Sequence, residues 1–147
     1  NIKTKLVIIG SGKEKENLLN LIKKNNLSNK VEIVDEVKRK DLISYYENAS
    51  VLIVSSRDEG GPRVALEALY LGVPVISTDV GHMQEILPRE LLANKDDLAS
   101  LHELLELYVD SIDLIDQSAI FEFVQNEFSI DERVKAITSA YEDVLSN

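Results

Sequence analysis

The chain has 147 residues, which is a usual length for one domain and enough to bury a hydrophobic core. Hydrophobic residues make up 44% and charged residues 29% of it, which excludes a disordered or low-complexity chain. It contains no cysteine, which excludes disulfides, thiolate metal sites and cysteine nucleophiles, and we expect a cytoplasmic protein.

The formal net charge of −10 is unevenly distributed along the chain. Residues 1–94 carry 13 basic and 13 acidic side chains, whereas residues 95–147 carry 13 acidic and three basic ones. Such an acidic region repels nucleic acid and anionic lipid, so we expect no nucleic-acid partner. We interpret its acidic side chains as the solvated outer face of C-terminal helices.

Short apolar runs alternate with segments of helical periodicity in the first two-thirds of the chain. The runs predicted to be buried strands are Leu6–Ile9, Val31–Val34, Val51–Val54, Val73–Ile76 and Leu91–Ala93. The predicted helices between them are Glu14–Lys24, Asp41–Glu47 and Arg63–Leu71, and further helices are predicted at about 95–109, 113–127 and 130–146, the last with Ser129 as its N-cap. This order predicts an α/β fold with a Rossmann-like, doubly wound parallel sheet and C-terminal helices. Because the chain begins at Asn1 and runs almost directly into a strand, we interpret it as a fragment of a longer polypeptide.

Ligands of open α/β sheets bind beyond the carboxyl ends of the strands, so the site is expected in the strand-to-helix loops. The first such loop contains Gly10-Ser-Gly12, whose glycines would let backbone amides approach an anion, although a tight turn without a ligand has the same pattern. The loop after the third strand places Glu59 before two glycines and Pro62, with Glu67 in the helix that follows. Its backbone donors and helix dipole suit a phosphate, and the two carboxylates suit sugar hydroxyls.

This loop and helix resemble the E-x7-E motif of retaining GT-B glycosyltransferases of family 4, with Glu59 and Glu67 as the two acids. Other stretches resemble the C-terminal, nucleotide-sugar-binding domain of that family in the same order, namely Leu6–Gly12, Val31–Val37, Tyr45–Val54 and Gly72–Gly81. The resemblance covers nearly the whole chain and implies the GT-B donor-binding lobe, a single domain over residues 1–147.

The resemblance also implies a role for each matched residue. Glu67 would hold the ribose hydroxyls of the nucleotide. Glu59, the first acid of the motif and the expected catalytic residue, would contact hydroxyls of the donor sugar. The backbone that would meet the sugar and the diphosphate is that of Gly60, Gly61, Pro62, Arg63 and Val64. The base would lie against the main chain of Val34, Asp35, Glu36 and Val37, and Gly10 and Gly12 would line the same cleft.

The chain departs from the family pattern at several points. Gly61 stands where an aromatic residue usually follows the first Glu-Gly, and His82 replaces the second glycine after Val80. The family's upstream arginine and lysine, which neutralise the diphosphate, are absent, which leaves Arg57, Arg63 and Lys38–Lys40 as the basic residues near the cleft. In a sheet of order 3-2-1-4-5-6 the absent upstream strand is the central one. We therefore expect unpaired inner edges on the first and third strands, an inactive fragment, and self-association.

From this resemblance we expect the chain to be the donor-binding lobe of a retaining glycosyltransferase. It would bind a nucleoside-diphosphate sugar, need no metal or other cofactor, and act with an N-terminal acceptor domain on a glycan, lipid or other acceptor. The full-length enzyme would be cytoplasmic or peripheral to the inner membrane surface. A GT-B sugar-nucleotide epimerase and a non-catalytic sugar-nucleotide-binding or assembly module remain alternatives. A flavodoxin-like signalling domain is disfavoured, because the first strand ends at Gly10 and not at an acidic phosphoacceptor.

Overall fold

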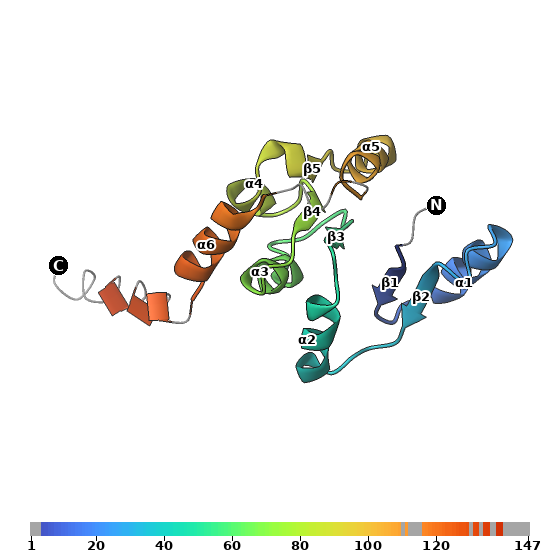
Figure 1. The fold of residues 1–147 in the computed structure, drawn as a ribbon, viewed down its shortest axis with the longest axis horizontal. Coiled ribbons are helices and arrows are strands. Elements are labelled where there is room, and N and C mark those ends of the chain that lie inside the picture. Colours follow the sequence, from blue (N-terminus) through green and yellow to red (C-terminus); the bar gives the residue numbers. More distant parts are fainter. Residues whose placement is uncertain are drawn as a thin grey trace. The chain divides into compact units, whose positions relative to one another are not determined.

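The computed structural model describes residues 4–109, 111, 116–129, 131, 132, 134, 135, 138 and 139. The chain divides into two compact units, Asn1–Tyr45 and Tyr46–Asn147. Both contain parallel strands and helices, as the α/β prediction requires, and each is described by itself (Figure 1).

The first unit contains strand β1 (Leu6–Ile9), helix α1 (Lys15–Lys24) and strand β2 (Val31–Val34). The two strands are parallel, and their register runs from Leu6 opposite Val31 to Ile9 opposite Val34. Helix α1 packs against β2 and buries Ile22, which follows from its apolar stripe. The first unit is therefore a small β-α-β arrangement (Figure 1).

The prediction that Leu6–Ile9 is a buried strand is correct for the strand and wrong for the burial. Leu6 is 45%, Val7 38% and Ile9 36% exposed. Ile8 is the one residue of this strand that is partly buried. Helix α1 packs against the neighbouring strand β2. A continuous apolar run predicts a strand that can be covered on both faces, but it does not supply the covering elements.

The second unit contains a three-stranded parallel sheet in the order β3-β4-β5, with β3 at Leu52–Val54, β4 at Val75–Thr78 and β5 at Leu92–Ala93. All four residues of the central strand β4 are buried. Strand β4 begins later than the predicted Val73–Ile76, because Pro74 has no N–H to give to the ladder. The carbonyl of Pro74 instead accepts a hydrogen bond of 2.8 Å from the Leu52 amide.

The helices of the second unit are α3 (Arg63–Tyr70), α4 (Met83–Ile86), α5 (Leu98–Val109) and α6 (Ser118–Glu127), with a 3-10 turn η1 at Arg89–Leu91. Helix α2 (Arg39–Glu47) contains the boundary between the two units. Helix α3 contacts β3, β4 and α6, whereas α5 contacts β4 and β5 (Figure 1). A core cluster of Ile76, Ala93 and Leu104 joins α5 to the sheet. Helices α3 and α5 thus both pack on a parallel sheet, in agreement with the predicted α/β fold.

A buried glutamine joins helix α6 to the sheet. The Gln117 side chain is 2% exposed, accepts a hydrogen bond from the Val75 amide at 3.2 Å and donates one to the Val75 carbonyl at 3.4 Å. Just before it, Asp116 accepts the Ser118 amide at 2.9 Å, and hydrogen bonds from the Ser118 side chain and backbone lower the pKa of Asp116.

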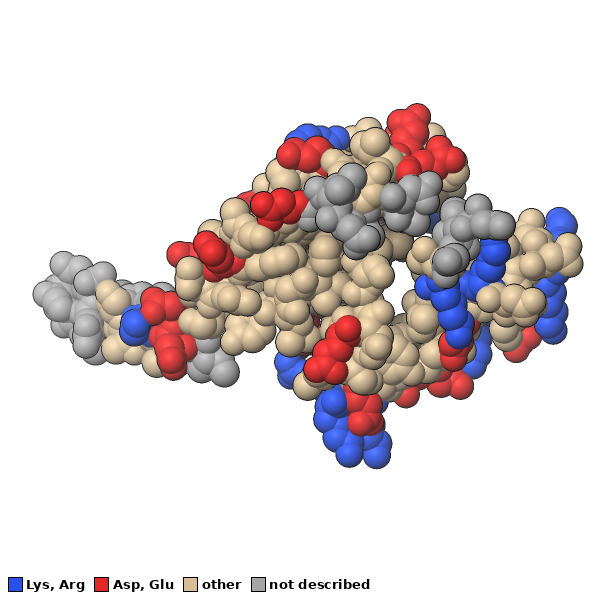
Figure 2. Space-filling view, in the orientation of Figure 1, with Lys and Arg blue, Asp and Glu red and all other residues tan. Residues whose placement is uncertain are grey.

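The C-terminal helices agree in part with the prediction. Helices α5 and α6 lie within the predicted segments 95–109 and 113–127, and Ser129 accepts the Glu132 amide at 3.3 Å as expected of an N-cap. Most of the predicted helix 130–146 lies outside the described residues. The acidic side chains on the described helices are exposed, as predicted, at Glu103, Glu106, Glu122 and Glu127, and Figure 2 shows red over α5 and α6.

Strands β1 and β3 each have one strand neighbour within the described part of the chain. Strand β1 is hydrogen-bonded to β2, and β3 is hydrogen-bonded to β4. Each strand therefore keeps one unpaired edge, as the sheet order predicts. No helix of the described residues is long and apolar enough to cross a membrane.

Candidate functional site

The predicted site residues of the first unit gather where β1 and β2 end. Gly10 has φ 144°, a conformation that favours glycine, and its amide donates to the Val34 carbonyl at 2.9 Å. Ser11 donates to the Glu36 carboxylate at 2.9 Å, and Lys15 forms an ion pair with Asp35. The loop containing Gly10 and Gly12 and the stretch from Val34 to Glu36 are thus held together by side-chain bonds.

The remaining predicted residues lie in the second unit, where the loop after β3 leads into α3. Pro62 is buried and is the N-cap of α3, so the helix begins at Arg63, as predicted. The Ala65 amide donates to the Pro62 carbonyl at 3.0 Å, and the amides of Arg63 and Val64 precede this first hydrogen bond of the helix. Arg63 and Val64 are exposed at this end, so a ligand could reach their backbone.

Neither the backbone conformation nor the packing of the described residues requires glycine at positions 60 and 61. Neither has a positive φ, and a Cβ on Gly60 would have no neighbour within 4 Å. A Cβ on Gly61 would meet only the ring of His82, at 3.8 Å, which is an ordinary contact distance. The two glycines therefore leave open space over the backbone just before the N-terminus of α3.

Glu59 is exposed, and two hydroxyl groups connect it to the sheet. Ser56 donates to the Glu59 carboxylate at 3.1 Å. Thr78, at the end of the buried strand β4, donates to the Ser56 carbonyl at 2.7 Å. The position of Glu59 is thus linked through Ser56 to the central strand, although the carboxylate itself faces solvent.

The loop that follows β4 packs directly on the backbone of Glu59 and Gly60. Gly81 has φ 54°, and a Cβ there would lie 2.5 Å from the Gly60 oxygen and 2.6 Å from the Glu59 oxygen. No side chain fits at this distance, so glycine is required at position 81 both by its φ and by space.

Glu67 lies half-buried on α3, among the buried residues Ala65, Ala68 and Leu69 of the same helix. Tyr46 of α2 is buried and donates its hydroxyl to Glu67 Oε2 at 3.0 Å. This bond offsets part of the cost of placing a carboxylate on an otherwise apolar helix.

A cavity of about 270 Å³ borders Gly61. It is lined by Gly61 and Pro62, by His82 and by the rings of Phe123 and Phe128, which pack edge to face at 6.1 Å. His82 pairs with Glu85 at 2.9 Å on the surface, where its side chain is 69% exposed.

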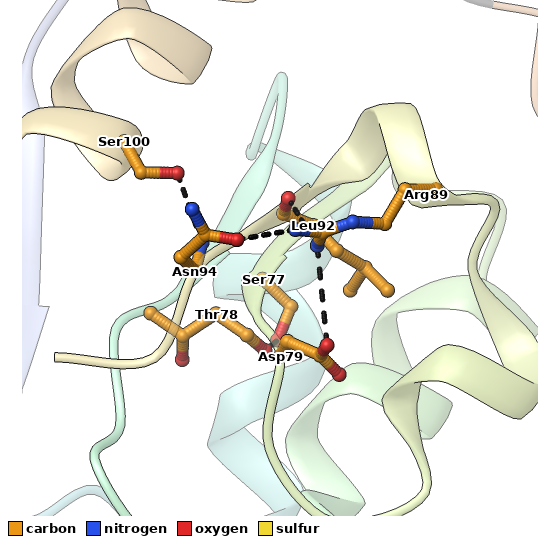
Figure 3. Close-up of polar contacts among 7 residues, drawn as sticks. All are labelled: Ser77, Thr78, Asp79, Arg89, Leu92, Asn94 and Ser100. Atoms are coloured by element: carbon orange, nitrogen blue, oxygen red, sulfur yellow. Dashed lines mark hydrogen bonds and ion pairs between the residues drawn. The ribbon is translucent and has the colours of Figure 1, made fainter. Parts of the chain in front are cut away.

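A polar cluster fixes the carboxyl ends of β4 and β5 (Figure 3). The Arg89 guanidinium donates to the Leu92 carbonyl at 3.0 Å, bonds the Asn94 side chain and lies 3.9 Å from Asp79. The Ser100 hydroxyl accepts a hydrogen bond from the backbone amide of Asn94 at 2.9 Å. The cluster satisfies backbone groups at these strand ends, which is a structural role.

The basic residues predicted near the cleft lie on the surface. Arg57 lies 3.6 Å from Asp96 in an exposed ion pair, which contributes little stability. The run Lys38–Lys40 is exposed around the start of α2. No group of three or more candidate metal ligands occurs among the described residues.

The structure therefore brings the predicted site residues together in two groups, one in each unit. Sequence reasoning missed four residues that support them, namely Tyr46, Ser56, Thr78 and Gly81. Gly81 carried a usable signal, because a glycine directly after a strand suggests a close backbone approach. The hydroxyl donors carried none, because serine, threonine and tyrosine occur at many positions without a role.

Comparison with known proteins identifies a family. The family described as "Glycosyl transferases group 1" matches residues 1–110. A glycosyltransferase of Haemophilus influenzae is 30% identical over 113 residues, which cover 74% of this chain and 31% of that protein. The amylovoran biosynthesis glycosyltransferase AmsD of Erwinia amylovora is 41% identical over 75 residues, or 51% of this chain and 21% of that protein. The chain thus spans a third or less of the length of these relatives.

Solved structures of similar fold include sucrose-phosphate synthase from Thermosynechococcus elongatus, with a TM-score of 0.81 and 25% identity over 97% of this chain and 39% of that one. Anabaena HepE in complex with UDP has a TM-score of 0.73 and 20% identity, and the match covers 97% of this chain and 41% of HepE. These likenesses confirm the predicted fold class, that of a GT-B glycosyltransferase lobe.

Proposed function

We propose that this chain, which belongs to the glycosyl transferases group 1 family, is the donor-binding part of a retaining glycosyltransferase and binds a nucleoside-diphosphate sugar. The observation that carries the proposal is the segment from Glu59 to Glu67. It places two carboxylates, each receiving a hydroxyl hydrogen bond, at either end of an open glycine backbone and a helix N-terminus. This combination suits hydroxyls at both ends and a phosphate between them.

Each group of residues contacts a different part of the nucleotide sugar. Glu67 accepts hydrogen bonds from the ribose hydroxyls, and Glu59 accepts them from the donor sugar. The backbone of residues 60–64 meets the sugar and the diphosphate, helped by the dipole of α3. In the first unit, Gly10, Gly12 and the main chain of residues 34–37 are proposed to contact the base.

The proposed reaction requires no metal. The bond between the sugar and the diphosphate breaks, and the electron pair leaves with the nucleoside diphosphate. Backbone amides and basic side chains stabilise this growing negative charge. The acceptor hydroxyl forms the new bond on the same face of the sugar and gives its proton to the departing diphosphate oxygen, so the configuration is retained.

The acceptor is assigned to an N-terminal domain of a longer, cytoplasmic enzyme that builds a polysaccharide or glycolipid. The relatives are consistent in size with such an enzyme, since this chain matches only part of each. Apart from that domain, the unpaired edges of β1 and β3 favour self-association of the fragment.

The proposal is tested by calorimetric titration of the chain with UDP, GDP and ADP, UDP first because HepE holds it. We expect at least one to bind, and Glu67→Ala to weaken that binding by roughly 10- to 150-fold, the range for hydrogen bonds to a charged group. Glu103→Ala on the exposed surface of α5 is the control and should bind like the wild type. Absence of binding to all three nucleotides, or equal binding by Glu67→Ala, would contradict the proposal.

A further inference from the structure

A buried phenol is attached to the acid that is proposed to hold the ribose. Tyr46 is 8% exposed, and its hydroxyl donates to Glu67 Oε2 at 3.0 Å. The two residues are 21 positions apart and belong to different helices, α2 and α3. The contact is therefore part of the tertiary structure and not a property of one helix.

The two partners differ in rigidity, so one of them determines the orientation of the other. A tyrosine ring has two side-chain torsions and is held by the core around it, whereas a glutamate has three and ends in a carboxylate that can rotate. The rigid partner consequently sets where the Glu67 oxygen lies. A carboxylate that must accept from two neighbouring hydroxyls at once benefits from such a fixed orientation, because no torsional freedom is then lost on binding.

The tyrosine uses one part of the accepting capacity of the Glu67 carboxylate. An ionised carboxylate offers about four acceptor directions on its two oxygens, and the bond from Tyr46 occupies one of them. Glu67 is half-buried and not fully enclosed.

We infer that Tyr46 is a positioning residue for nucleotide recognition, which orients the Glu67 carboxylate toward the ribose hydroxyls; this inference rests on the function proposed above. Tyr46 itself does not touch the nucleotide. Its removal should therefore reduce only the part of the affinity that depends on ribose hydroxyls.

The test compares UDP with 2′,3′-dideoxyuridine diphosphate, or the matching pair for whichever nucleotide the titration selects. The measured quantity is the ratio of the two dissociation constants, which reports ribose recognition. We expect the wild type to prefer the hydroxylated nucleotide by at least 10-fold, and Tyr46→Phe to lower this ratio by about 3- to 10-fold. Affinity for the dideoxy nucleotide should not change.

Two controls separate positioning from a general structural effect. Tyr45→Phe makes the same chemical change at the preceding position of α2 and should leave the ratio unchanged. Adding Tyr46→Phe to Glu67→Ala should have no further effect on the ratio, because the tyrosine acts through the acid. Urea unfolding of each variant checks that it is folded, and Tyr46→Phe keeps the ring that packs in the core.

The outcomes are distinguishable. If Tyr46→Phe weakens the binding of both nucleotides equally, Tyr46 does not position the acid, and the inference is overturned while the proposed function stands. The same conclusion follows if Tyr46→Phe changes the affinity for neither nucleotide while Glu67→Ala abolishes the preference for ribose hydroxyls. If the wild type shows no preference for ribose hydroxyls, or Glu67→Ala keeps the preference, the ribose role of Glu67 is wrong and the inference fails with it.

Discussion

The Cα of Gly81 lies so close to the carbonyl of Gly60 that a Cβ on Gly81 would be 2.5 Å from the Gly60 oxygen. The loop after β4 and the loop after β3 therefore support each other, backbone against backbone. Since Gly60 belongs to the proposed donor-binding segment, the shape of that segment depends on a residue outside it.

Gly81→Ala should destabilise the chain more than a glycine replacement elsewhere. It combines an unfavourable φ of 54° with a clash against backbone, for a total of roughly 2–4 kcal/mol. Gly72→Ala is the matched control, because Gly72 has φ 75° but open space around it, and it should cost about 1–2 kcal/mol. Urea denaturation measures both, and equal losses would show that the two loops do not constrain each other.

Gln117→Met should also destabilise the chain. The methionine keeps the approximate shape but leaves the amide and the carbonyl of Val75 without their side-chain partner, which costs about 2–4 kcal/mol for the two groups. Gln125→Met is the control, since the exposed Gln125 donates one bond of 3.0 Å to the Tyr70 carbonyl, and its loss should cost about 1 kcal/mol or less. A similar change in unfolding free energy for both variants would remove the special role of Gln117.

The strand and helix types were predictable because the apolar runs and the helical periodicity are clear. The boundary of β4 was misplaced because Pro74 cannot donate to the ladder, and the short helix α4 was missed because four residues carry no periodic pattern. The burial of β1 was overestimated for a different reason. Exposure depends on which other elements cover a strand, and a local apolar run does not contain that information.

The candidate site was predictable to the extent that its residues are contiguous. The segment from Glu59 to Glu67 is one loop and one helix, so its motif is visible in the sequence. The bond from Tyr46 to Glu67 spans two helices, and the bond from Thr78 to the Ser56 carbonyl joins two strand ends. Such pairs form through tertiary packing. Neither the spacing of these residues nor a periodic pattern in the sequence indicates which of them will meet.

Glu59→Gln in the longer enzyme proposed above should lower turnover while leaving nucleoside diphosphate affinity nearly unchanged. Hydroxyl contacts that strengthen as the sugar becomes cationic act in the transition state, so their loss appears in kcat. Asp58→Asn is the neighbouring control, because the Asp58 side chain is 97% exposed, and it should keep its turnover. A Glu59 variant that loses nucleotide affinity but keeps turnover would assign the residue to the nucleotide instead.

The isolated chain should be catalytically silent. Transfer requires the acceptor to be held against the donor, and the loss of that positioning is worth about 7–11 kcal/mol of barrier. Because β1 and β3 keep unpaired edges in the described part of the chain, the same sample should associate in light scattering. A monomer that hydrolyses or transfers sugar would contradict both expectations.

The most direct measurement of where the donor binds is a titration of the isotope-labelled chain with a nucleoside-diphosphate sugar, followed by the backbone amide resonances in NMR spectra. We predict that the perturbed amides fall in two groups, residues 10–12 with 34–37 and residues 59–64. Amides around the exposed pair of His102 and Glu106 on α5 serve as the internal reference and should not shift. Saturable binding that leaves both groups unperturbed would contradict the proposed site.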